Sequence, residues 1–374
     1  MKPPNVHPLW RDPAVIRKFR TAVSLHGHTM HSQECLSFLP RYLRRIPGVS
    51  QFVRRRQSQP PGGCGSLDFA RAWWTPPLSP AAALQVEREQ IGGLGLHPLV
   101  SLTDHDDIEA GAALEVTAER SEVPISVEWT APYGQSILHL GIHNLPAGAE
   151  RFWIAAMRDY AAAPQEARLP ELLSPLSKIP ETLIVLNHPF WREEGVGEAA
   201  HQCALEKFLR ECREWIHAFE LNGTRPWREN AAAIALGEAH GLPTISGGDR
   251  HACEPAACLN LTNARTFPEF AAEIRRGLSV LLFMPQYREP LSLRFLEAMW
   301  DILRPYPEYP GRERWTDRIF YRGEDEVVRP LSTLWRNRAP WMLNGAAAAV
   351  QLLATTRLRA ALRLLLADRG QVFP

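Results

Sequence analysis

The chain has 374 residues, and its 42 lysine and arginine residues nearly balance 41 aspartate and glutamate residues, so the formal net charge at pH 7 is +1. This balance excludes a strong overall field for binding nucleic acid or an anionic membrane, so any such affinity has to come from a local patch. The length allows one large core or two smaller ones, because single domains reach about 250 residues.

Between residues 20 and 285, short runs of β-branched and aliphatic residues recur, and most of them are followed by a helical pattern. This alternation predicts an α/β domain over residues 1–285. The continuous apolar character of the runs favours a parallel sheet buried on both faces. We expect strands at 21–25, 99–103, 123–127, 136–140, 182–186, 215–221, 243–246 and 279–283.

Three regions interrupt this alternation. Residues 36–80 are rich in arginine and hold no acidic residue between Leu36 and Leu67, which predicts a basic insertion. Its arginine cluster at 41–56 either contacts a nucleic-acid backbone or belongs to a solvated loop. Residues 144–181 combine a helix-like stretch with a proline-punctuated link.

From about residue 286 onward the pattern predicts a helical C-terminal extension over 286–374. It closes with an amphipathic run at 346–369, which either packs on its own domain or lies on a membrane or a partner helix. The longest weakly charged stretch, 339–354, is too short to span a bilayer. The six cysteines form no C-x-x-C pair and the N-terminus lacks the apolar core of a signal peptide, so we expect a reduced, cytoplasmic protein without a transmembrane segment.

Metal-type side chains follow the C-terminal ends of nearly all the expected strands. In a barrel of parallel strands the loops at this end converge on the active site, so we expect these side chains to meet. His26 and His28 lie two residues apart on a strand and therefore project from one face, and Asp249 and His251 repeat this spacing. The candidate metal ligands at these strand ends are His26, His28, His105, Glu128, His139, His188, Asp249 and His251.

Imidazole and carboxylate ligands without a thiolate suit zinc, manganese or iron better than a sulfur-rich structural zinc site. Four further polar residues near the strand ends, Asp104, Asp106, Glu220 and Asn222, are expected to orient or cap their neighbours rather than bind metal. His143 is either packed in the core or orients a ligand.

The segments HGHTxxS, LTDHD, VEWT followed by LHLGIH, NHP, ELN and GGDRH occur in this order over about residues 20–285. Together they resemble the polymerase and histidinol phosphatase (PHP) family. The resemblance implies a distorted, TIM-like (β/α)7 barrel with two or three divalent metal ions at its C-terminal mouth. The spacing of VEWT to LHLGIH is similar to that of small phosphoesterases that act on nucleotides and short RNA ends.

The resemblance also implies a division of the ligands among three ions. Family members of this type usually carry an aspartate directly after the serine of HxHTxxS; this chain has Gln33 there, and Glu34 is the candidate replacement. The implied sets are His26, His28, Glu128 and Asp249 for one ion, Glu128, His139 and His188 for a second, and His105 with His251 for a third.

These observations predict a metal-dependent hydrolase that cleaves phosphate esters by a metal-activated water, on a nucleotide, a short oligonucleotide or another small phosphorylated metabolite. The candidate catalytic residues are Asp249, His251 and Glu128. Arg250, Arg192 and Arg225 lie beside the ligand motifs and are the candidates for gripping a phosphate. Two alternatives stay open: a non-catalytic, metal-stabilised binding module, and an amidohydrolase-like enzyme that hydrolyses C–N bonds.

Overall fold

A computed structural model describes residues 5–36, 69–116, 123–335 and 341–354, together with Leu358, Leu362 and Arg363. The arginine cluster at 41–56 and most of the expected insertion lie outside these residues. Among the residues that are described, no helix is long and apolar enough to cross a membrane.

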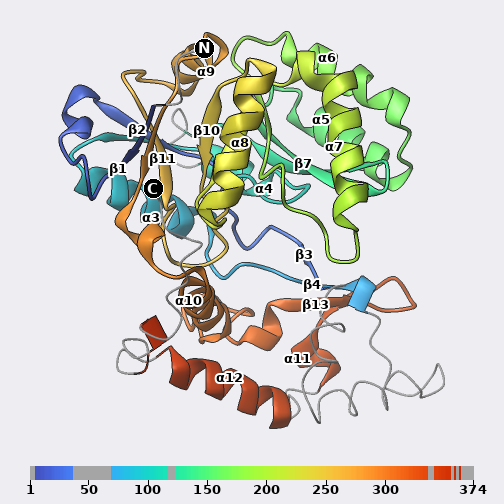
Figure 1. Cartoon of the computed structure of the whole chain (residues 1–374). Helices are drawn as coiled ribbons and strands as arrows, with labels where there is room; N and C mark the ends of the chain where they lie inside the picture. Colours follow the sequence, from blue (N-terminus) through green and yellow to red (C-terminus); the bar gives the residue numbers. More distant parts are fainter. Residues whose placement is uncertain are drawn as a thin grey trace.

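Two five-stranded sheets form the body of the molecule (Figure 1). In order, the first contains β1 (Asn5–Pro8), β12 (Val280–Phe283), β11 (Cys258–Thr262), β2 (Thr21–Ser24) and β5 (His97–Val100). The second contains β10 (Thr244–Gly247), β9 (Ala218–Asn222), β8 (Leu183–Leu186), β7 (Ser136–His143) and β6 (Val127–Tyr133). The predicted α/β class is therefore confirmed.

Both sheets are mixed, so the expectation of a parallel sheet was wrong for several pairs. β11 runs antiparallel to β2 and β12, and β7 runs antiparallel to β6 and β8. The turn between β6 and β7 explains one reversal, because only Gly134 and Gln135 separate the strands and such a short connection forces a hairpin. Gly134 adopts the positive φ, 60°, that this tight turn requires.

The two sheets approach each other through isolated bridges between Gly27 and Arg250 and between His105 and Glu128. Across the described strands the hydrogen bonding does not close into one barrel, so the structure shows the expected distorted (β/α)7 barrel only as an α/β body of two linked, mixed sheets. Both bridges join residues of the candidate site or their neighbours. The linkage between the sheets and the site therefore depend on the same segments.

Helices cover the outer faces of the sheets (Figure 1). Against β6 and β7, the ring of Trp129 packs edge-on to Tyr160 at 5.3 Å, and Tyr133 meets Phe208 at 5.5 Å. The helices are α3 (Pro80–Gly93), α4 (Glu109–Glu115), α5 (Glu150–Ala162), α6 (Leu169–Ser177), α7 (Glu198–Cys212), α8 (Trp227–His240) and α9 (Phe267–Arg275). Short 3₁₀ helices lie at Val15–Lys18, Phe69–Arg71, Glu166–Arg168, Arg213–Trp215, Pro285–Arg288 and Trp315–Asp317.

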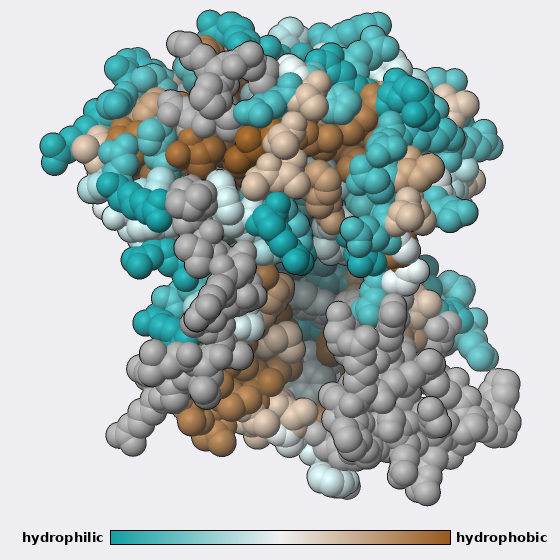
Figure 2. Space-filling model, in the orientation of Figure 1, coloured by the Kyte–Doolittle hydropathy of each residue, from teal (hydrophilic) through white to brown (hydrophobic). Residues whose placement is uncertain are grey.

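A third, four-stranded sheet lies below the body in Figure 1. Its order is β14 (Val328–Pro330), β13 (Ile319–Arg322), β4 (Ala72–Trp74) and β3 (Glu34–Cys35). With α10 (Leu291–Leu303), α11 (Leu331–Leu334) and α12 (Trp341–Leu353) it forms a lower layer, so the part of the chain expected to be helical also supplies two strands. Figure 2 shows hydrophobic surface on this layer near α10 and α12, where Phe295 and Leu352 are exposed.

Candidate metal centre

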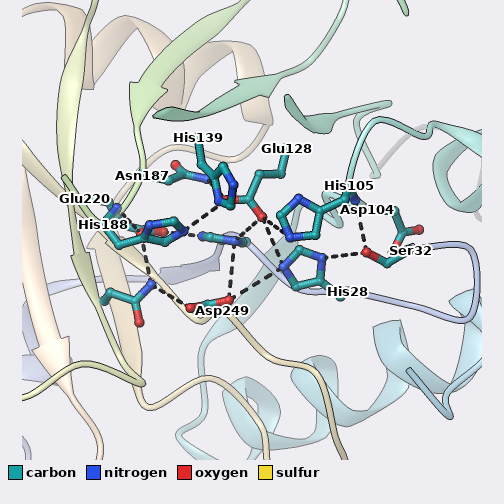
Figure 3. A network of polar contacts seen from close by, with 12 residues as sticks. His28, Ser32, Asp104, His105, Glu128, His139, Asn187, His188, Glu220 and Asp249 are labelled. Carbon is teal, nitrogen blue, oxygen red and sulfur yellow. Dashed lines mark hydrogen bonds and ion pairs between the residues drawn. The ribbon is translucent and has the colours of Figure 1, made fainter. Parts of the chain in front are cut away.

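The imidazoles and carboxylates expected at the strand ends meet around Glu128, which lies on β6 (Figure 3). Glu128 is fully buried, and its Oε2 faces three imidazoles. The Nε2 atoms of His26, His28 and His105 lie 2.8, 3.2 and 3.4 Å from this oxygen. One carboxylate oxygen is thus shared by three nitrogen atoms that are able to bind metal.

The other oxygen of Glu128, Oε1, faces a second set of nitrogens. His188 Nε2 lies 3.1 Å away and His139 Nδ1 lies 3.3 Å away. The Asn187 amide donates to the same oxygen at 3.0 Å and fixes the carboxylate. Because its two oxygens face different imidazoles, Glu128 has the geometry of a carboxylate that bridges two cations.

Asp249 closes the cluster from the loop after β10. Its Oδ1 lies 3.7 Å from Nε2 of both His26 and His28. Its Oδ2 instead accepts hydrogen bonds from the Asn222 amide at 3.3 Å and the Thr224 hydroxyl at 3.0 Å. One oxygen is therefore anchored by the protein while the other faces the imidazoles.

Glu34 enters the cluster from β3, next to the position where the PHP resemblance implies an aspartate. Its Oε1 lies 3.3 Å from His251 Nε2, and its Oε2 lies 3.6 Å from His105 Nε2. Ser32 donates to Oε1 at 2.6 Å and so helps to hold the carboxylate. The structure places Glu34, the neighbour of Gln33, among the candidate ligands.

Four groups of side chains place one ligand atom each within 4.8 Å of one another. His26, His28, His105 and Glu128 each belong to two of the groups, so cations bound there would be adjacent. They are His28, Glu34, His105 and His251; His26, Glu128 and His188; His26, His28 and Asp249; and His105, Glu128 and His139.

Two buried nitrogens test whether a cation fits. His28 Nε2 and His139 Nδ1 are inaccessible to solvent and make no hydrogen bond, although both face Glu128. Buried polar atoms are nearly always satisfied by protein, water or an ion. Two ligands bound to one tetrahedral ion at about 2.1 Å lie about 3.4 Å apart, which matches the nitrogen–oxygen separations of this cluster. The buried histidine, glutamate and aspartate groups are therefore suited to divalent metal binding.

Backbone strain coincides with the cluster. His26, His188 and Asp249 have φ angles of 61°, 26° and 47°, in a region that residues other than glycine rarely adopt. Such conformations cost about 1–3 kcal/mol each and persist where the surrounding structure imposes them, commonly at functional sites. His26 and His188 both face Glu128, and His26 also faces Asp249. The strained backbone positions are therefore those whose side chains form the cluster.

Glu220, on β9, contacts two residues of the cluster, His26 and His188. Its Oε1 lies 2.5 Å from His26 Nδ1, and its Oε2 accepts the backbone N–H of His188 at 2.8 Å. A side chain at Gly247 would overlap the Glu220 carboxylate, so glycine is required there. Asn222 donates to Oε2 at 3.0 Å. Glu220 and Asn222 thus lie where an orienting role was expected.

Asp104 and Asp106, which flank His105, hold loops. Asp104 accepts the Thr29 backbone N–H at 2.5 Å and its hydroxyl at 2.7 Å, and burial raises the pKa of Asp104 to about 6 against these hydrogen bonds. Asp106 accepts the backbone N–H of Thr130 at 2.9 Å. Both carboxylates therefore fix the segments on either side of His105.

His143 is packed in the core behind the cluster. It is 1% exposed, and its Nδ1 lies 2.8 Å from the Ser101 hydroxyl. Burial, together with the charge on His26, lowers the pKa of His143 to about 3. The imidazole is therefore neutral at physiological pH.

The charges of the cluster are strongly coupled. Although burial disfavours their charged forms, the neighbouring histidines hold the pKa values of Glu128 and Asp249 well below their usual range, with His26 acting on both. Against the same desolvation, Glu34 and Asp249 raise the pKa of His251 to about 9. The carboxylates are thus ionised, which suits cation binding.

The structure separates the three candidate arginines. Arg225 lies at the cluster, with Nη2 3.3 Å from Asp249 Oδ2, and its buried Nε has no hydrogen-bond partner. Arg250 is buried and points away, donating through Nε to Glu87 at 3.0 Å and through Nη1 to a backbone carbonyl. Arg192 is exposed and donates to the Val196 carbonyl at 2.8 Å. The contacts therefore bring only Arg225, of these three, to the cluster.

Sequence reasoning missed several supporting residues. Asn187 directly precedes His188 in the NHP segment, and this position could have indicated that Asn187 lies at the cluster. Trp191 packs at 4.7 Å against His139 with a tilted ring and lies 5.9 Å from the Arg225 guanidinium, but no pattern distinguishes it from a core tryptophan. Glu87 lies inside α3 and gives no signal in the sequence, because its partner Arg250 is 163 residues away.

No protein-family model matches the chain, and no curated protein matches it in sequence. Among solved structures, PsfC from Pseudomonas syringae has a TM-score of 0.41 at 14% identity, covering 72% of this chain and 93% of that one. A Bifidobacterium adolescentis protein described as a metal-dependent phosphoesterase has a TM-score of 0.32 at 15% identity, covering 54% and 92%. An amidohydrolase from Chromobacterium violaceum has a TM-score of 0.34 at 15% identity, covering 61% and 87%. These similarities are distant.

Proposed function

We propose that the chain is a PHP-like, metal-dependent hydrolase that cleaves phosphate esters of a nucleotide, a short oligonucleotide or another small phosphorylated compound. The observation that carries the proposal is the buried Glu128 carboxylate, whose two oxygens face five imidazoles between them. A bridging carboxylate brings cations close together, and paired cations are characteristic of enzymes that transfer or hydrolyse phosphoryl groups.

Two to three divalent ions, manganese, zinc or iron, would be held by the four groups of ligand atoms described above. When bound, such ions supply a water that is ionised near neutral pH and neutralise charge on the phosphoryl oxygens. The chain itself contributes the fixed positions of Glu128 and Asp249, together with His251 at the more exposed side. These three are the proposed catalytic residues.

Arg225 is the proposed phosphate-binding residue. Its guanidinium lies beside Asp249 and over the Trp191 ring, and its Nε is buried without a partner. An arginine with unused donors next to a cation cluster suits a phosphoryl oxygen, because charge-assisted hydrogen bonds to phosphate are strong and directional. Trp191 also packs against His139, with 4.7 Å between the ring centroids.

The test is hydrolysis of a panel of nucleoside monophosphates, dinucleotides and sugar phosphates, with manganese added and bound metal measured in the same samples. Monoester hydrolysis is followed as inorganic phosphate and dinucleotide hydrolysis as the mononucleotide and nucleoside products. We expect two to three metal equivalents and turnover of at least one class of ester. Metal binding without hydrolysis of any ester in the panel would contradict the proposal. A parallel panel of amides identifies C–N hydrolysis as the alternative outcome.

A further inference from the structure

One candidate ligand is carried by the lower layer rather than by the two sheets of the body. Glu34 lies on β3, which pairs with β4, and β4 pairs in turn with β13 of the C-terminal part of the chain (Figure 1). In this sheet Trp74 pairs with Glu34 on one side and with Ile319 on the other. Glu34 is therefore two strands away from residues almost 290 positions later in the sequence.

Side chains reinforce this connection. Phe320 on β13 stacks on Trp73 at 6.0 Å. The Arg312 guanidinium lies 5.4 Å from the Phe320 ring and donates through Nη1 to the Met30 carbonyl and the Thr75 hydroxyl, both at 3.0 Å. Met30 lies between His28 and Glu34 in the chain. Through one nitrogen, Arg312 thus connects the C-terminal part of the chain to the loop between His28 and Glu34 and to the residue that follows β4.

The segment that carries Arg312 is itself fixed by a buried arginine. Arg318 is 2% exposed, and it donates to the carbonyls of Ile302 at 2.6 Å, Arg304 at 2.9 Å and Arg312 at 2.8 Å. Its guanidinium lies 4.9 Å from the Tyr306 ring. These bonds join the end of α10 to β13 and make residues 302–318 one braced unit.

Helix α10, which leads into this unit, contacts the loop that carries His251. Asp301 accepts the Cys253 backbone N–H at 3.1 Å, and Arg294 pairs with Glu254 at 2.7 Å. Glu34 and His251 face each other at 3.3 Å in the group His28, Glu34, His105 and His251. The segments that carry Glu34 and His251 are therefore both supported by residues 291–322. Glu128, His139 and His188 instead lie on or just after strands of the second sheet.

Resting on the proposed metal centre, we propose that residues 291–322 are a positioning brace for Glu34 and His251. The brace sets the affinity of the cation position formed by His28, Glu34, His105 and His251, and it leaves the positions around Glu128 largely unaffected. Arg312 is its main positioning residue. The C-terminal part of the chain thereby controls how many metal ions the site holds.

The experiment measures manganese or zinc equivalents and stepwise affinities in the full-length protein, with thermal unfolding in EDTA recorded for each variant. We expect three equivalents in the wild type and a weakest site bound at least tenfold less tightly in Arg312→Ala, with the other two affinities changed less than threefold. Arg312→Lys keeps a donor for Met30 and Thr75 and is expected to restore part of the loss. Arg322→Ala is the matched control, because Arg322 lies on β13 but is exposed and pairs only weakly with Glu326 at 3.6 Å.

Two further variants make the outcome decisive. Glu34→Gln is expected to lose the same single equivalent, and Phe320→Leu, which removes the ring stacked on Trp73, is expected to weaken it if Arg312→Ala does not fold. Three equally tight equivalents in Arg312→Ala or Glu34→Gln would overturn the brace, as would a wild type that binds only two, or an equal loss at every position in both Arg312→Ala and Phe320→Leu. A wild type that binds no metal would instead refute the proposed function.

Discussion

The inner wall and the rim of the candidate site are built differently. The inner wall consists of His26, Glu128, His188 and Asp249, whose side chains are at most 7% exposed. The rim consists of Glu34, His105 and His251, whose side chains are 12–25% exposed. Inner-wall residues stand at strand ends of the body, whereas Glu34 stands on a two-residue strand of the lower layer. We infer that the positions of the inner-wall residues are set by the packing of the body, whereas the positions of the rim residues depend on the lower layer.

Asp249→Ala is the most severe change to the inner wall. Losing the carboxylate oxygen that faces His26 and His28 should remove at least one metal equivalent, and kcat/KM should fall by roughly 1,000-fold or more, about 4 kcal/mol of transition-state stabilisation. Elemental analysis and phosphate release check both effects. Asp159→Ala, at an exposed position on α5, is the control. Unchanged metal binding in Asp249→Ala would refute the assignment of the inner wall.

A second variant tests whether the inner wall depends on the core beneath it. Glu87 and Arg250 are 2% and 3% exposed and pair at 3.0 Å, and the Arg250 carbonyl accepts the His28 N–H at 2.8 Å. Glu87→Gln keeps the volume but leaves the buried guanidinium unpaired, so we expect a loss of about 3 kcal/mol in the free energy of unfolding.

Denaturant unfolding of the metal-free protein measures this loss. Glu89→Gln, at an exposed position on the same helix, is the matched control and should change stability by less than about 0.5 kcal/mol. If Glu87→Gln were equally neutral, the inner wall would not depend on this ion pair.

The same contrast explains what the sequence could predict. The strand runs at 21–25, 182–186, 243–246 and 279–283 were placed within one residue of the observed strands, because buried strands are continuous apolar runs. β11 was missed, because CLNLT alternates polar and apolar residues and gave no such run. The parallel sheet was wrong for several strand pairs, because strand direction depends on connections such as the two-residue turn after Tyr133 rather than on composition.

The convergence of the inner wall was predictable from short, local motifs at strand ends. The third sheet was not, because it pairs Glu34 with Trp74 and Trp74 with Ile319, and sequence patterns do not report such distant pairing. The direction of the Arg250 side chain was not predictable for a related reason. Its neighbours Asp249 and His251 face the cluster, but adjacent side chains need not point the same way. Arg250 instead donates to the buried Glu87 carboxylate on α3.

Arg225→Ala separates substrate binding from metal binding. Loss of charge-assisted hydrogen bonds to phosphate should lower kcat/KM by roughly 30-fold, about 2 kcal/mol, while the metal equivalents stay the same. Arg225→Lys should recover part of the loss, because lysine keeps the charge but not the planar donor pair. Arg228→Ala, at an exposed position in α8, is the control. A loss of metal in Arg225→Ala would show instead that the guanidinium supports Asp249.

The smallest expected effect concerns His143, behind the inner wall. Its folded-state pKa of about 3 lies below the ordinary value of 6.5, so as the pH falls the unfolded chain takes up this proton first. The contribution of His143 to stability is therefore complete above pH 6.5 and is lost progressively as the pH falls toward 3. At about pH 5.5 the loss should be about 1.4 kcal/mol.

His143→Gln removes this titration while keeping a group that is able to hydrogen-bond to Ser101. The two metal-free proteins should therefore differ in how much stability each loses between about pH 7.5 and 5.5, and the wild type should lose about 1.4 kcal/mol more. The titrations of the carboxylates and of the remaining histidines cancel in this difference, because both proteins contain these groups. Equal losses would mean that His143 accepts a proton in the folded state, and the inner wall would then be less tightly closed than its burial indicates.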